Sequence, residues 1–119
     1  MLKDDYCQRY QKFTALLWAM RQSLETEDAL LIKQALQAVQ QFFGVEILGL
    51  PVDELSESCR GKVRAYQTEI HKELRLLTTD LMFLAVSRSQ GTVVSRLAGV
   101  KERITLLERY CEAVLSLQE

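Results

Sequence analysis

Residues 96–115, RLAGVKERITLLERYCEAVL, carry the most regular apolar pattern of the chain. Their apolar side chains follow one another at intervals of three or four residues: Leu97, Val100, Ile104, Leu107, Cys111 and Val114. This spacing places the side chains along one side of an α-helix and is the period of a seam between helices. The segment therefore predicts a helix that packs against other helices.

The same period occurs upstream of this helix, in Val63, Tyr66, Ile70, Leu74, Leu77, Leu81 and Leu84. We expect a third helix that begins at Asp53 or Ser56 and continues to about Ser89, with residues 90–92 closing it and capping the fourth helix. Gly61 lies inside the pattern and costs about 1 kcal/mol relative to alanine, so a start just after it is an alternative. At roughly 30 residues, this helix is about 45 Å long.

Two shorter helices precede the third one. The first is indicated over about residues 4–24 by Tyr6, Tyr10, Phe13, Leu17, Met20 and Leu24. The second is capped within residues 26–28, ends at Gly44, and has its apolar side at Ile32, Ala35, Leu36, Val39, Phe42 and Phe43. Residues 44–51 contain two glycines and a proline and predict a loop held to the core by Ile47, Leu48 and Leu50. The expected fold is all-α: one four-helix bundle-like domain over residues 1–119, with a long third helix.

Composition agrees with a packed domain. The chain has 119 residues, of which 48% are hydrophobic and 26% charged, as in ordinary globular proteins. Two acids among the first six residues and the lack of an apolar run of about 18 residues predict a soluble, cytoplasmic protein without a membrane partner. Cys7, Cys59 and Cys111 are far apart and odd in number, which favours reduced thiols.

Candidate chemical groups are few. His71 is the only histidine, and its charged neighbours indicate a solvated helix face. No phosphate-binding glycine motif or nucleophile elbow occurs. We therefore expect a non-enzymatic protein with no catalytic, cofactor-binding or metal-binding residues.

Charge is distributed unevenly along the chain. Residues 1–59 hold 5 Lys/Arg against 9 Asp/Glu, whereas residues 60–109 hold 10 against 5. Within the basic segment, one ridge of the third helix is formed by Arg60, Arg64, Gln67, His71 and Arg75, here called the strip. The strip is interpreted as a solvated face, as a docking site for an acidic protein surface, or as a nucleic-acid contact. The net charge of the whole chain, −1, does not favour nucleic acid as the partner.

Residues 74–86 are apolar around most of the helix rather than along one side. Such a helix is normally covered on more than one side. Burial by the other three helices is one explanation. A homodimer is the other, with an interface formed by Leu76, Met82, Phe83 and Val86.

Five segments follow one another in an order shared with a known family: Tyr10–Phe13 (YQKF), Val39–Phe43 (VQQFF), Tyr66–Leu84 (YQTEIHKELRLLTTDLMFL), Arg96–Leu97 and Tyr110–Cys111. In these segments the chain resembles the cyanobacterial heterocyst frequency control protein PatD family. The resemblance covers nearly the whole chain, and residues 66–84 are its most specific part. It implies a small helical protein that binds the tubulin-like division protein FtsZ, promotes FtsZ assembly and, in filamentous species, influences heterocyst frequency. A nucleic-acid-associated regulator that uses residues 60–109 is the alternative.

Overall fold

Four long helices make up most of the chain in the computed structural model, which describes residues 2–118. They are α1 (Asp4–Glu25), α2 (Ala29–Phe42), α3 (Glu57–Val86) and α4 (Gln90–Leu115). Between α2 and α3 lie a π-helical turn, η1 (Phe43–Ile47), and a short 3-10 helix, η2 (Val52–Glu54). The described residues contain no strand. The predicted all-α fold with a long third helix is confirmed, since α3 has 30 residues.

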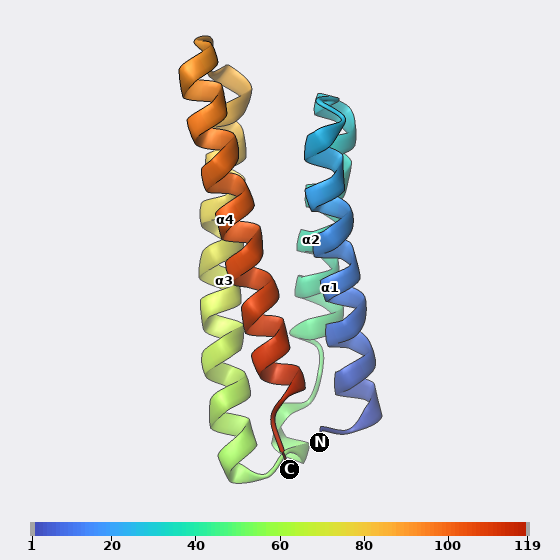
Figure 1. Cartoon of the computed structure of the whole chain (residues 1–119). Helices are drawn as coiled ribbons and strands as arrows, with labels where there is room; N and C mark the ends of the chain where they lie inside the picture. The colour runs from blue at the N-terminus through green and yellow to red at the C-terminus, as the bar shows by residue number, and fades with distance from the viewer. Residues whose placement is uncertain (1, 119) are drawn as a thin grey trace.

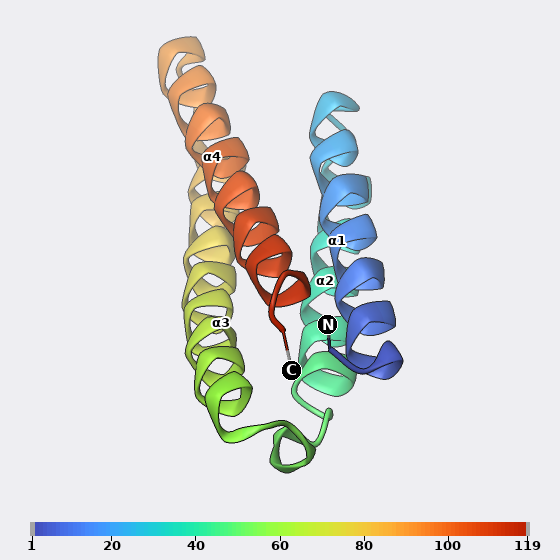
Figure 2. The same ribbon diagram turned by 60° about the horizontal axis from the view of Figure 1, so that its bottom comes forward.

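The helices form two antiparallel hairpins, α1–α2 and α3–α4, that lie side by side in an elongated bundle of 50 × 19 × 18 Å (Figures 1 and 2). Helix α1 packs along α4, whereas α2 touches α3 only over a short stretch. We call the end with η1, η2 and residues 2 and 118 the closed end. The opposite end, with the turns at residues 26–28 and 87–89, is the open end. There the α3–α4 hairpin extends past the α1–α2 turn (Figure 1).

The apolar patterns read from the sequence form the core. All six side chains predicted to line the first helix are buried, as are five of the six predicted for the fourth; Leu97 is half-buried. Phe13 is stacked against Phe42, with 6.2 Å between ring centroids, and lies 5.8 Å from Phe43. These contacts join α1 to α2 and η1. No helix within residues 2–118 has both the length and the apolar character needed to cross a membrane.

Side-chain oxygens fix the starts of three helices. Asp28 Oδ1 accepts hydrogen bonds from Leu30 N and Leu31 N, and Ser56 Oγ accepts one from Cys59 N. Ser56 is thus the cap of α3, and the alternative start after Gly61 is wrong. Ser89 Oγ accepts from Thr92 N, so the cap of α4 precedes the predicted residues 90–92.

The predicted loop after the second helix is partly wrong. Gly44 does not end the helical path, because the chain continues through η1, where Leu48 N donates to Phe43 O at 2.9 Å. This wider turn directs Ile47 into the core, and Leu50 is also buried, as expected. Leu48 was expected to be an anchor but is 46% exposed, since the same turn rotates it toward the surface.

Candidate partner-binding face

The strip begins at the closed end, where two of its arginines contact the segment before α3. Arg60 Nη2 donates to Leu55 O at 3.2 Å and lies 3.5 Å from Asp53 O. Arg64 Nη2 lies 3.4 Å from Asp53 Oδ1, in an exposed ion pair. These two arginines therefore hold the connection around η2 to the start of α3.

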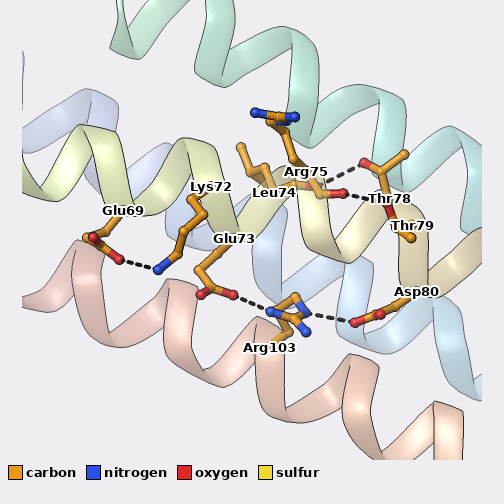
Figure 3. A network of polar contacts seen from close by, with 9 residues as sticks. All are labelled: Glu69, Lys72, Glu73, Leu74, Arg75, Thr78, Thr79, Asp80 and Arg103. Carbon is orange, nitrogen blue, oxygen red and sulfur yellow. Dashed lines mark hydrogen bonds and ion pairs between the residues drawn. The ribbon is translucent and has the colours of Figure 1, made fainter.

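The middle of the strip faces the α1–α2 hairpin. Gln67 is half-buried beside Tyr10; burial raises the pKa of Tyr10 well above its usual range, and the neighbouring Gln67 side chain opposes that shift. The His71 ring is tilted against Phe43, with 6.0 Å between centroids. Arg75 is exposed and points away from α4 (Figure 3). The structure thus brings the five residues onto one side of α3, but four of them contact other parts of the chain.

The predicted dimer residues are all at the surface, with 41% of Leu76, 67% of Met82, 49% of Phe83 and 70% of Val86 exposed. They lie along the exposed side of α3, opposite its buried residues, with Met82 at the edge toward α2 and Leu76 and Phe83 at the edge toward α4. Gln40 Nε2 of α2 donates to Thr78 Oγ1 at 2.7 Å, and Met82 lies one turn beyond Thr78 on this α2-facing side. Phe83 instead contacts Arg96 of α4, and Leu76 lies two turns before Phe83 on the α4-facing side.

We call the α4-facing surface the outer face and define it by Leu76, Phe83, Val86 and Arg96. The guanidinium carbon of Arg96 lies 4.9 Å from the centroid of the Phe83 ring. Arg96 Nε is buried and has no hydrogen-bond partner among the described residues. A cation held over a half-exposed aromatic ring gives this face an apolar surface with a fixed positive charge.

A hollow of about 550 Å³ adjoins the outer face; it is lined by Asp80, Gly91, Thr92, Ser95, Arg96, Gly99 and Arg103. Its small residues Gly91, Ser95 and Gly99 are four apart and lie on one side of α4. A Cβ atom added at Gly91 or Gly99 would meet nothing within 4 Å. The glycines are therefore not required by packing inside the chain, and their missing side chains leave the hollow open.

A partly buried ion-pair network joins α3 to α4 next to the hollow. Arg103 Nη1 lies 2.5 Å from Glu73 Oε2, and Arg103 Nε lies 2.7 Å from Asp80 Oδ2 (Figure 3). Burial lowers the pKa of Arg103, but the hydrogen bonds to Asp80 and Glu73 outweigh it and raise that pKa overall. Glu73 is 5% exposed, so its charge depends on Arg103 for compensation.

Sequence reasoning missed Arg96, the hollow and the Glu73–Arg103 pair. The spacing of Gly91, Ser95 and Gly99 could have indicated a side of α4 that another group can approach closely. The ion pair could not have been predicted from the sequence, because 30 residues separate Glu73 and Arg103. No group of three or more His, Cys, Asp or Glu within residues 2–118 is arranged to hold a metal ion.

Comparison of the chain with models of known protein families, with curated proteins and with solved structures found no match.

Proposed function

We propose that this chain is a non-enzymatic binding protein that engages FtsZ and promotes FtsZ assembly. The resemblance of residues 66–84 to the PatD family supplies the name of the partner. The outer face supports the binding role, because Leu76, Phe83 and Val86 expose apolar area next to Arg96. Exposed apolar side chains that cluster beside an arginine are typical of protein-binding surfaces.

The chemistry of the outer face suits a protein partner with apolar and acidic side chains. Phe83 provides an aromatic anchor, the hollow on α4 provides space for a side chain, and the guanidinium group of Arg96 provides a positive charge. Arg96 is held in place by Phe83, so binding costs it little side-chain entropy. In this proposal the protein is cytoplasmic and recruited to the division ring, with an influence on heterocyst frequency in filamentous species.

The alternative, a nucleic-acid-associated regulator, is favoured by the excess of cations in residues 60–109. However, four of these cations, at Arg64, Lys72, Lys101 and Arg103, already pair with carboxylates. Paired cations release fewer counterions on binding phosphate, which weakens this alternative. Duplex binding that falls steeply with salt, together with no binding to FtsZ, would favour it over the proposed function.

Co-sedimentation with assembled FtsZ tests the proposal. We expect the wild-type chain to pellet with FtsZ and to increase the polymer fraction. Phe83→Asp should abolish co-sedimentation, because it replaces the aromatic anchor with a charge that the partner must desolvate. Val45→Asp is the matched control, since Val45 is similarly exposed but lies on η1.

The strip is tested separately by the double reversal Arg64→Glu with Arg75→Glu. Reduced binding at unchanged helix content would assign the strip a role beside the outer face. Unchanged binding by Phe83→Asp would remove the outer face and leave FtsZ binding as the function. Absence of binding by the wild-type chain would overturn the proposed function itself.

A further inference from the structure

Apolar side chains remain uncovered at the open end of the bundle. Lys101 Nζ lies 2.8 Å from Oε1 of Glu25, the last residue of α1, so α1 ends beside Lys101. Val94 lies two turns beyond Lys101 on the same side of α4 and is 57% exposed. Met82 of α3 is also exposed, but it does not lie past the end of α2, because α2 continues from Gln40, the contact of Thr78, toward the open end as far as Ala29. The α3–α4 hairpin extends past the α1–α2 turn (Figure 2), and Val94 is exposed near the start of α4 on this hairpin.

The two turns of the open end carry opposite charge. Residues 22–32 contain Glu25, Glu27 and Asp28 and no cation. Residues 81–100 contain Arg88 and Arg96 and no acid. Each turn also has exposed apolar side chains beside it, Leu30 and Leu31 on α2 beside the acidic turn and Val94 on α4 beside the basic one. The chain therefore contains two complementary surfaces at the same end.

The backbone of the acidic turn is strained at Glu27. This residue has φ of 56°, and it is the single non-glycine residue with positive φ among residues 2–118. The left-handed conformation costs an ordinary residue roughly 1 kcal/mol, which glycine or asparagine largely avoids. Glu27 follows Thr26, the C-cap of α1, at the position where a left-handed residue commonly ends a helix, and its exposed carboxylate adds to the negative charge of the turn.

We propose that a second copy of this chain docks on the open end across a two-fold axis, with Arg88 of each protomer against Glu27 and Asp28 of the other. The contact buries Leu30 and Val94 of both copies. A second copy fits better than a different acidic protein, because one two-fold rotation brings both turns opposite their complements at once.

This dimer differs from the interface predicted from the sequence, because Leu76, Met82 and Phe83 lie outside the proposed contact. It presents two copies of the outer face, which suits the linking of FtsZ subunits or filaments by multivalency. The dimer itself does not depend on FtsZ binding, and its test uses this chain alone.

Sedimentation equilibrium of the full chain at tens of micromolar and low salt tests the proposal. We expect a dimer mass for the wild type, and dimerisation at least tenfold weaker for Arg88→Glu and for Glu27→Arg, since each reversal adds repulsion. The double variant with both reversals should recover the dimer, because the ion pair is restored in the opposite sense. Arg109→Glu, at an exposed position on α4 outside both turns, is the matched control.

Glu27→Gly separates the proposed contact from a role in the turn. It should raise the unfolding midpoint of the dilute monomer, because glycine relieves the strain, and it should weaken the dimer, because the carboxylate is lost. A wild-type monomer, a dimer unaffected by both single reversals, or a double reversal that stays monomeric at unchanged helix content would each overturn the proposal. Glu27→Gly with an intact dimer would also overturn it.

Discussion

The two ends of the bundle bury their apolar residues to different extents. At the closed end, Leu2, Leu50 and Leu55 are each less than 5% exposed. Tyr6 donates a hydrogen bond to Pro51 O there, and Cys59 Sγ lies 3.0 Å from Gln118 O. At the open end, Leu30 is 62% exposed, and Val94 is exposed as well. The connections of the chain cover the closed end, whereas the open end has two short turns and no covering segment among residues 2–118.

This difference follows from helix lengths and connection lengths. Helix α3 has 30 residues and α4 has 26, but α1 has 22 and α2 has 14. Helix α2 is followed by η1 and η2 at the closed end, and this connection covers the core at that end. Stability of the monomer is therefore expected to depend on the closed end, and association on the open end.

The largest expected effect is a difference between two leucine substitutions. Leu55→Ala at the closed end should destabilise the monomer by about 3 kcal/mol, because it removes a buried side chain and leaves a cavity. Leu31→Ala at the open end should cost about 0.5 kcal/mol or less, because Leu31 is exposed. Urea unfolding of dilute protein measures both. Similar losses for the two variants would contradict the distinction between the ends.

A smaller effect is expected for the ion pair at the base of the overhang. Arg103→Met leaves Glu73 buried without compensation and should cost about 2 kcal/mol, less than for a fully buried pair because Arg103 is partly exposed. Glu73→Leu combined with Arg103→Met should recover most of that loss, since no buried charge remains at Glu73. Urea unfolding measures the losses, and hydrogen exchange locates them.

In Arg103→Met, amide exchange should accelerate in residues 81–98 and not around η2, because the pair joins α3 to α4 near the open end. An equal acceleration at the closed end would show that the overhang is not a separate unit of stability.

Sequence periodicity was sufficient for the four helices and nearly all of the core. The steps of three and four residues identified Tyr10, Phe13, Ile104 and Leu107 as interior positions, and all four are buried. Capping oxygens before an apolar run indicated helix starts: Ser56, one of the two starts predicted for the third helix, is its cap. Local signals failed at Gly44, where the contacts of η1 with the core outweigh the helix-ending tendency of glycine.

The candidate sites were harder to predict, because they depend on which helices are neighbours. All-round apolarity of residues 74–86 showed that α3 has more than one contact side, but not that Met82 and Phe83 face different directions. That distinction requires the positions of α2 and α4, which place Gln40 beside Thr78 and Arg96 over Phe83. The exposed apolar residues of the open end could not be predicted from the sequence either, since their exposure results from a difference in helix length between the two hairpins.

The smallest expected effect concerns the exposed ion pair between Glu25 and Lys101, which joins the two hairpins where the open end begins. The hydrogen bond and charge of Lys101 hold the pKa of Glu25 below its ordinary value. A carboxyl group with a lowered folded-state pKa contributes stability above its unfolded pKa, and that contribution is lost as pH falls through the folded pKa. The pair should therefore stabilise the hairpin contact at neutral pH and cease to do so in acid, below the usual range of glutamate, about 4.3.

Lys101→Met sharpens the comparison of the ends, because it removes this tie without changing the buried core. The pKa of Glu25, measured by NMR titration of its side-chain carboxyl carbon, should rise toward the ordinary value. Arg109→Met is the control and should leave the pKa of Glu25 unchanged. Any stability difference between wild type and Lys101→Met should be small, because the pair is exposed, and should shrink as the pH is lowered. If the pKa of Glu25 is the same in Lys101→Met as in the wild type, Lys101 does not hold the α1–α2 turn to α4. The open end would then begin closer to the closed end than Lys101.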